Sequence, residues 1–285
     1  MVMRGRFSQW GVLCCLLVAF GAATSAQAHV LRLGPKPPVE VKRVVTLAPS
    51  LTETVLALGA GETLVGVSRF DEAPAVAKLP RVGGYNDPSL EAVLALSPQV
   101  VLAQMAPANQ AAVEKLAELG ISVIAFSLTS LADAVEAIEV VGHALGKVKA
   151  AQALNKAIAD TRAATQARAK ARAHRPTVLF VVSFQPLVVA GPGSFIDELL
   201  QDVGAQNIAA KSVTPFPQFS LERVVKAQPD VIIDAAFSAE GREWVQRLPA
   251  LKKTRWVKMS SGELWHPGPA LADGLLKLEA WVYPP

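Results

Sequence analysis

The stretch SLEAV at residues 89–93 returns as SLERV at residues 220–224, and this repeat decides how the sequence is interpreted. At the same offset, Tyr85 ahead of the first copy corresponds to Phe216 ahead of the second. The similarity continues behind each copy with two further matches, Pro98 with Pro229 and Val100 with Val231. Internal self-similarity of this kind indicates a duplicated structural unit. We therefore expect two lobes related by pseudo-symmetry.

Each copy predicts the same local structure, which is an aromatic loop, a helix and then a buried strand. The serine that starts each copy is a preferred helix N-cap. The glutamate behind it, Glu91 or Glu222, falls in the first turn, where the helix dipole favours a carboxylate. Stabilisation of the helix is a sufficient explanation for a single glutamate of this kind. Two glutamates at equivalent places on two lobes are also suited to docking on a basic partner with two-fold symmetry.

Short β-branched runs alternate with amphipathic helical segments on both sides of the repeat, which predicts parallel strands joined by helices and hence an α/β fold. The helix expected at 51–58 carries a start signal, because Ser50 and Glu53 have the spacing of a capping box. The expected strands are residues 43–47, 65–67, 100–103, 123–126, 178–182, 188–190 and 231–234. The other expected helices are residues 90–96, 109–119, 195–203, 221–227 and 274–281.

A long Ala-, Lys- and Gln-rich helical stretch occupies residues 131–172 and is interrupted by Gly142 and Gly146. The part behind Gly146 is either a solvated helix of one domain or a stiff connector between two lobes. The α/β pattern resumes directly afterwards, which favours the connector. The expected organisation is an N-terminal α/β lobe at 41–145, a connecting helix at 146–174 and a C-terminal α/β lobe at 175–285.

The N-terminus has the pattern of a secretory signal peptide. Two arginines precede an apolar run at about residues 10–23, and the small-residue motif AQA at 26–28 follows. We predict that residues 1–28 are removed, with cleavage after Ala28, and that the mature protein is periplasmic.

Both cysteines, Cys14 and Cys15, lie inside the segment expected to be removed, so we expect no disulfide and no thiol chemistry in the mature chain. The net charge of the whole chain is +4. Removal of the two N-terminal arginines lowers it further, which gives no electrostatic case for nucleic-acid binding. Hydrophobic residues make up 51% of the chain and charged residues 18%, a composition typical of a globular protein and not of a disordered one.

From residue 43 almost to its end, the chain resembles the helical-backbone class of periplasmic binding proteins, which serve ABC importers of cobalamin, ferric siderophores and haem. The likeness rests on residues 45–53, residues 83–103, the long central helix, and PFPQ at 215–218 running into residues 220–222. It is strongest toward cobalamin-binding proteins. The resemblance implies a ligand cleft between two lobes joined by one rigid helix, with no cofactor and no catalysis. It also implies that a monomeric receptor delivers a corrinoid or another metal chelate to an inner-membrane permease dimer.

The same resemblance implies roles for single residues. It assigns Glu91 and Glu222 to docking on arginines of the permease. It places Tyr85 and Phe216 in the ligand cleft, where cobalamin-binding proteins tend to have tryptophan, and Gln104 stands at another tryptophan position. The further cleft positions that it implies are Phe70, Phe184, Trp265 and His266.

Several alternatives stay open on the sequence. Tyr85 and Phe216 are also explained as packing residues, and His266 as a loop histidine with an ordinary hydrogen bond. A haem receptor is the main rival, because Tyr85 and His266 are both able to supply axial ligands. A ferric-siderophore receptor is the other member of the class, and a zinc or manganese receptor lacks a cluster of ligating side chains.

An enzyme is the weaker alternative in a different class. None of the serines sits in a G-x-S-x-G elbow. We therefore expect a binding protein, with an exported hydrolase or a ligand-free scaffold as the remaining possibilities.

Overall fold

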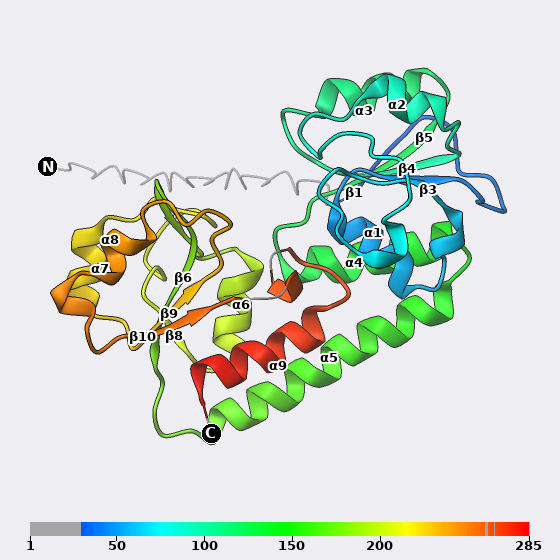
Figure 1. Ribbon diagram of the computed structural model, residues 1–285. Coiled ribbons are helices and arrows are strands. Elements are labelled where there is room, and N and C mark those ends of the chain that lie inside the picture. Colours follow the sequence, from blue (N-terminus) through cyan, green and yellow to red (C-terminus); the bar gives the residue numbers. More distant parts are fainter. Residues whose placement is uncertain (1–29, 260–261, 265, 285) are drawn as a thin grey trace, which may run out of the picture.

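The computed structural model describes residues 30–259, 262–264 and 266–284. The predicted signal peptide and Trp265 lie outside these residues. Figure 1 shows two α/β lobes with the long helix α5 running beneath both of them, beside α9. Among the described residues, no helix combines the length and the apolar character that crossing a bilayer requires.

The N-terminal lobe is built on a sheet with the strand order β1-β5-β4-β2-β3. Its inner strands are parallel, whereas β1 pairs antiparallel with β5 and matches Leu31 with Ala125. The strands are β1 (Val30–Leu33), β2 (Val44–Thr46), β3 (Leu64–Gly66), β4 (Val100–Gln104) and β5 (Ser122–Phe126). Helices α1 and α4 cover one face, and α2 and α3 cover the other. The helices are α1 (Pro49–Ala57), α2 (Leu90–Ala95), α3 (Gln110–Glu118) and α4 (Leu131–Ala144).

The C-terminal lobe repeats this arrangement on a sheet with the order β10-β9-β6-β7, in which β8 also pairs with β6. Helices α6 and α9 cover one face, and α7 and α8 cover the other. The strands are β6 (Thr177–Phe184), β7 (Leu187–Val189), β8 (Gln206–Asn207), β9 (Val231–Asp234) and β10 (Arg255–Lys258). The helices are α6 (Phe195–Asp202), α7 (Leu221–Ala227), α8 (Arg242–Gln246) and α9 (Leu271–Val282). Short 3-10 turns occur at Gly61–Thr63, Pro74–Val76, Pro249–Leu251 and Gly262–Leu264.

The repeat found in the sequence holds in three dimensions. Ser89 caps α2 by accepting a hydrogen bond from the Ala92 amide, and Ser220 caps α7 in the same way through the Arg223 amide. Each helix leads into an inner strand, β4 or β9, and each strand pairs in parallel with a neighbour in its own sheet. The prediction of a two-lobed α/β fold is therefore confirmed.

Helix α5 (Val148–Lys170) joins the two sheets along the chain and has 23 residues, which gives a length of about 34 Å. Most of its surface is exposed, and two of its buried residues, Ala151 and Ile158, belong to a core that extends into both lobes. Gly142 lets α4 pack closely against α5, because a Cβ there would come within 2.5 Å of the Ala151 Cβ. Gly142 therefore lies within α4, and the helix ends before Gly146, which has a positive φ.

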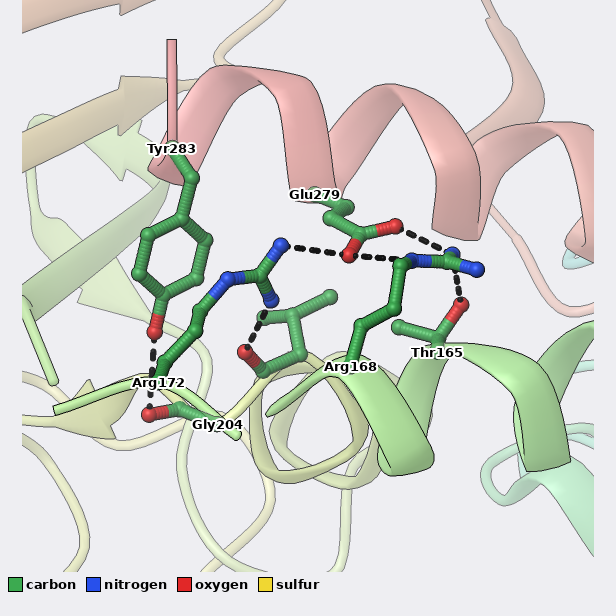
Figure 2. Close-up of polar contacts among 7 residues, drawn as sticks. Thr165, Arg168, Arg172, Gly204, Glu279 and Tyr283 are labelled. Atoms are coloured by element: carbon green, nitrogen blue, oxygen red, sulfur yellow. Dashed lines mark hydrogen bonds and ion pairs between the residues drawn. The ribbon is translucent and has the colours of Figure 1, made fainter. Parts of the chain in front are cut away.

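A cluster of charged side chains fixes the far end of α5 to α9, as Figure 2 shows. The Glu279 carboxylate, which is nearly buried, accepts hydrogen bonds from the Arg168 Nε at 2.9 Å and the Arg172 Nη2 at 2.7 Å. The Arg168 hydrogen bond, with a smaller contribution from Arg172, lowers the pKa of the Glu279 carboxyl despite its burial. Arg172 also lies 3.9 Å from the centre of the Tyr283 ring. The connector is thus held to the C-terminal lobe by charge pairs as well as by apolar contacts.

Three local predictions were wrong or incomplete. The capping box does not form, because α1 begins at Pro49, a residue suited to the first helical position, and leaves Ser50 inside the helix. The sheets are not wholly parallel, since the edge strands β1 and β7 are antiparallel. The short elements β1, β8, α8 and β10 were not predicted at all.

Candidate functional site

The carboxyl ends of the inner strands of both sheets lead into loops that meet where the lobes touch. The Phe195 amide at the start of α6 donates a hydrogen bond of 2.8 Å to the Thr129 carbonyl, behind β5. The Leu131 amide donates to the Glu198 carboxylate at 3.1 Å. Open α/β sheets bind ligands outside the carboxyl ends of their strands, so the loops around this junction form the candidate site.

On the N-terminal lobe, Phe70 and Tyr85 form an aromatic pair with ring centres 6.3 Å apart and planes inclined by 52°. Phe70 is 49% exposed, whereas Tyr85 is partly buried against the core. The Asn109 side-chain amide donates to the Tyr85 carbonyl at 2.5 Å and to the Gln104 carbonyl at 2.7 Å. The loop that carries Tyr85 is therefore tied to the loop behind β4.

The residues around Phe70 hold its ring in place. Arg69 forms two hydrogen bonds with the Asp87 carboxylate, at 2.9 and 2.8 Å, and its guanidinium lies 4.9 Å from the centre of the Phe70 ring. Asp71, on the other side of Phe70, is buried, and this burial raises the pKa of its carboxyl. The exposed ring thus projects from a loop that is anchored on both sides.

On the C-terminal lobe, Phe216 and Phe237 line a small apolar pocket of about 180 Å³. Phe216 is 42% exposed and Phe237 is 79% exposed. The remaining walls of the pocket come from β6, α6, the loop behind β9 and the turn before α9. They are formed by Phe180, Val182, Phe195, Ile196, Ala235 and Leu264. The loop that carries Phe216 packs on Gly191, whose amide donates to the Pro215 carbonyl at 2.8 Å.

Phe237 was not among the candidate ligand contacts predicted from the sequence, although its position in the chain indicates one. It follows a buried strand by a few residues, at the carboxyl end where ligand-contacting side chains gather. Phe184, by contrast, is only 6% exposed and stacks on Trp256 with ring centres 6.2 Å apart. The structure gives Phe184 a place in the core of the C-terminal lobe, so we leave it out of the candidate site.

His266 lies on the loop that leads into α9 and reaches across to α1 of the other lobe. Its Nε2 is 3.5 Å from the Glu53 Oε1, and its Nδ1 is buried without a hydrogen-bond partner. Burial lowers the pKa of His266 to about 4, so the ring is neutral at physiological pH. The contact is therefore a polar contact of a neutral imidazole and not an ion pair.

A larger cavity of about 590 Å³ opens on the N-terminal lobe, between α3 and the edge formed by β1 and β5. Its lining includes the apolar residues Leu31, Val113 and Ala125 and the polar residues Thr129 and Asn109. Thr129 touches the C-terminal lobe at Phe195, and Asn109 holds the Tyr85 loop, so the cavity adjoins both aromatic surfaces.

Glu91 and Glu222 lie away from these pockets, in the exposed first turns of α2 and α7. In Figure 1 both helices are on the sides of their lobes remote from α5. The two carboxylates thus occupy equivalent positions on the outer surface of the two lobes.

The arrangement is suited to binding a large, largely apolar ligand. Aromatic rings face the solvent on both lobes, and aromatic faces bind flat ligands by stacking. Among the described residues, no three His, Cys, Asp or Glu side chains are grouped so that they could hold a metal ion.

Comparison with known proteins identifies the architecture. Residues 44–259 match the periplasmic binding protein family. The chain belongs to this family. It is 32% identical to an uncharacterized ABC transporter substrate-binding lipoprotein of Bacillus subtilis, over 86% of this chain and 81% of the relative. The chain is therefore a periplasmic binding protein of the ABC importer type, and the family places it outside the cytoplasm.

Two further relatives of this binding protein differ in the ligand that they are named for. A vitamin B12-binding protein of Salmonella paratyphi A is 35% identical over 70% of this chain and 74% of its own length. The crystal structure of a periplasmic haem-binding protein from Pseudomonas aeruginosa is 28% identical, with a TM-score of 0.72, and covers 86% of this chain and 93% of its own. The family and these relatives are binding proteins, and together they do not resolve the ligand.

Proposed function

We propose that this protein captures a corrinoid of the cobalamin type between its two lobes and delivers it to an inner-membrane ABC permease. The observation that carries the proposal is the pair of unlike aromatic surfaces at the lobe junction. The Phe70–Tyr85 pair offers a tilted surface on one lobe, and Phe216 with Phe237 offers an exposed surface on the other. A rigid macrocycle with apolar edges has the size and the flat faces that such surfaces bind.

The contact set that we propose consists of Tyr85, Phe216, Phe70 and Phe237. Trp265, which lies outside the described residues, stays a proposed contact, and so does its neighbour His266. His266 lies in the loop that leads into α9, two positions after Leu264 of the pocket wall.

Haem is the second candidate, and the likeness to a haem-binding structure favours it. Iron coordination by His266 would have a cost in this structure, because its Nε2 faces Glu53 and its Nδ1 is enclosed. The Tyr85 loop is tied down by Asn109, which further restricts any movement of the tyrosine toward an iron atom. Coordination of haem iron therefore requires His266 or the Tyr85 loop to move, whereas stacking of a corrinoid does not require this movement.

We further propose that Glu91 and Glu222 dock on basic groups of the permease. Both are exposed, both sit on Ser-capped helices, and they are related by the internal repeat. Matched carboxylates on two lobes are complementary to a partner whose two subunits present matched arginines. We also propose that the signal peptide is cleaved behind Ala28, which N-terminal sequencing of the exported protein would test. The mature receptor is then a monomer in the periplasm.

A thermal-shift panel tests the ligand assignment. The purified mature protein is heated with cyanocobalamin, cobinamide, haemin and several ferric siderophores in separate samples. A ligand present at about 100 times its Kd stabilises the folded state by about 2.7 kcal/mol. The proposal predicts a large shift with the corrinoids and little with haemin. A large shift with haemin alone would replace the proposal with the haem receptor.

A further inference from the structure

The cavity on the N-terminal lobe has a volume of about 590 Å³, whereas the aromatic pocket on the C-terminal lobe measures about 180 Å³. Pockets that enclose a small molecule have volumes of about 300 to 1,000 Å³. The N-terminal cavity is thus large enough to enclose a bulky group, whereas the pocket at Phe216 accepts only an edge or a face.

The walls of the cavity come from parts of the chain that are far apart in sequence. Leu31 on β1 lies beside Ala125 on β5, because these residues are paired across the sheet. Helix α3 covers the same face with Val113, and β1 extends the sheet next to β5. Leu31 is 39% exposed, so the strand that closes the cavity presents apolar surface to it. Such surface is stabilised when an apolar group covers it.

The cavity is connected to the loops that carry the proposed ligand surfaces. Met105 and Ala106, behind the carboxyl end of β4, line it. Asn109 links this loop to the Tyr85 carbonyl, and Thr129 links the opposite rim to Phe195 of the other lobe. The cavity therefore lies next to the loops that carry the proposed ligand surfaces on both lobes.

The charge of the cavity lining favours a group without free carboxylates. The cavity lining contains no Lys or Arg, and its charged residue is Glu114, which accepts a hydrogen bond from Gln110 at 2.8 Å. Free carboxylates such as those of haem are therefore disfavoured there.

We propose that this cavity, closed by the N-terminal strand β1, is a second compartment of the ligand site that takes the nucleotide tail of a corrinoid. The tail ends in an apolar aromatic base, which matches the wall of Leu31, Val113 and Ala125. The assignment rests on the proposed corrinoid function. It also gives β1 a role in ligand binding in addition to its place in the sheet.

Filling the cavity tests this compartment. Leu31→Trp and Ala106→Trp add bulk at partly exposed positions of the wall and the mouth. Leu119→Trp is the matched control, because Leu119 is 51% exposed at the opposite end of α3 and does not line the cavity. Each variant is titrated with cyanocobalamin and with cobinamide, a corrinoid that lacks the nucleotide tail, and melting curves check that each variant folds.

The wild type should bind cyanocobalamin at least about tenfold more tightly than cobinamide, since a tenfold difference corresponds to about 1.4 kcal/mol. Both filled variants should lose most of this preference while they keep their affinity for cobinamide, and the control should behave as the wild type. Equal loss of both ligands, or no loss of either, would overturn the tail assignment. A wild type that binds neither corrinoid would instead overturn the proposed function.

Discussion

The two lobes share a framework but differ in the surfaces that they turn toward each other. Their α2 and α7 helices have the same serine cap and the same first-turn glutamate, and both lead into an inner parallel strand. The loops at the junction differ. One lobe has an aromatic pair, whose Tyr85 loop is held by Asn109, and a large cavity, and the other has Phe216 and Phe237 around a small pocket. The common framework suits a symmetric partner, and the unlike surfaces suit a ligand with two different sides.

The largest expected effect is on permease binding, when the glutamates that the two lobes share are neutralised. Glu91→Gln and Glu222→Gln should each weaken binding to the permease by about 2 to 5 kcal/mol if each carboxylate meets a buried arginine. Stability should fall by only about 0.3 to 1 kcal/mol each through the lost interaction with the helix dipole. Transport into cells, measured beside ligand titration of the free protein, separates these two effects.

Ligand affinity is the control for the docking variants, because neither carboxylate lines a described pocket. Charge reversal to Lys at either position should impair uptake more than the Gln variant does. Normal uptake by the double Gln variant would contradict the docking role and leave both glutamates with helix stabilisation alone.

A smaller effect is expected on the pH dependence of stability, through His266, which lies at the contact between the lobes. The folded-state pKa of this imidazole is lowered by burial to about 4, below the usual 6.5, so the unfolded chain binds more protons between these pH values. His266 therefore reduces the free energy of unfolding as the pH falls from about 6.5 to about 4, by about 3 kcal/mol in full.

Denaturant unfolding at several pH values measures this effect when the wild type is compared with His266→Gln, which does not titrate. The loss of stability below pH 6.5 should be smaller in the variant. The comparison removes the contribution of Asp71, whose raised pKa acts in the opposite direction. Parallel stability curves for the two proteins would show that the imidazole is not buried in its neutral form.

The unlike surfaces can be compared by removing one ring from each lobe. Tyr85→Ala and Phe216→Ala should each weaken cyanocobalamin binding by about 1 to 3 kcal/mol. Phe216→Ala should have little effect on the melting temperature, because Phe216 is 42% exposed. Tyr85→Ala should lower the melting temperature more, since Tyr85 also packs against the core.

Isothermal titration and thermal melts on the same samples give both quantities. Phe184→Ala serves as a contrast, because its buried ring should cost stability and leave affinity nearly unchanged in the protein that remains folded. Variants at Tyr85 and Phe216 that bind normally but melt much earlier would identify both rings as packing residues.

The framework was predictable because the repeat and the alternation of strands and helices are local patterns. The serine caps, the first-turn glutamates and the long helix all have near-neighbour causes. The capping-box pattern gave the wrong start for helix α1, because the helix begins at Pro49, ahead of the serine that was expected to cap it. Glu53 instead lies within 3.5 Å of His266, a contact between residues too distant in sequence for a local pattern to predict.

The site was less predictable because its geometry depends on long-range packing. Strand β1 falls directly behind the predicted cleavage motif and pairs with β5 across some 90 residues, so no local pattern indicates it. The cavity between β1 and α3 could therefore not be anticipated. Phe184 follows the family pattern for a cleft position, but stacking on Trp256 buries it. The exposed Phe237 lines one pocket with Phe216, which lies some 20 residues earlier in the chain on a different loop.

The most direct test of the account is a crystal structure of the mature protein with cyanocobalamin. The account predicts one corrinoid between the lobes, in contact with Tyr85 on one side and Phe216 on the other, with Glu91 and Glu222 exposed and free of the ligand. A ligand bound to one lobe alone, or one that contacts either glutamate, would contradict it.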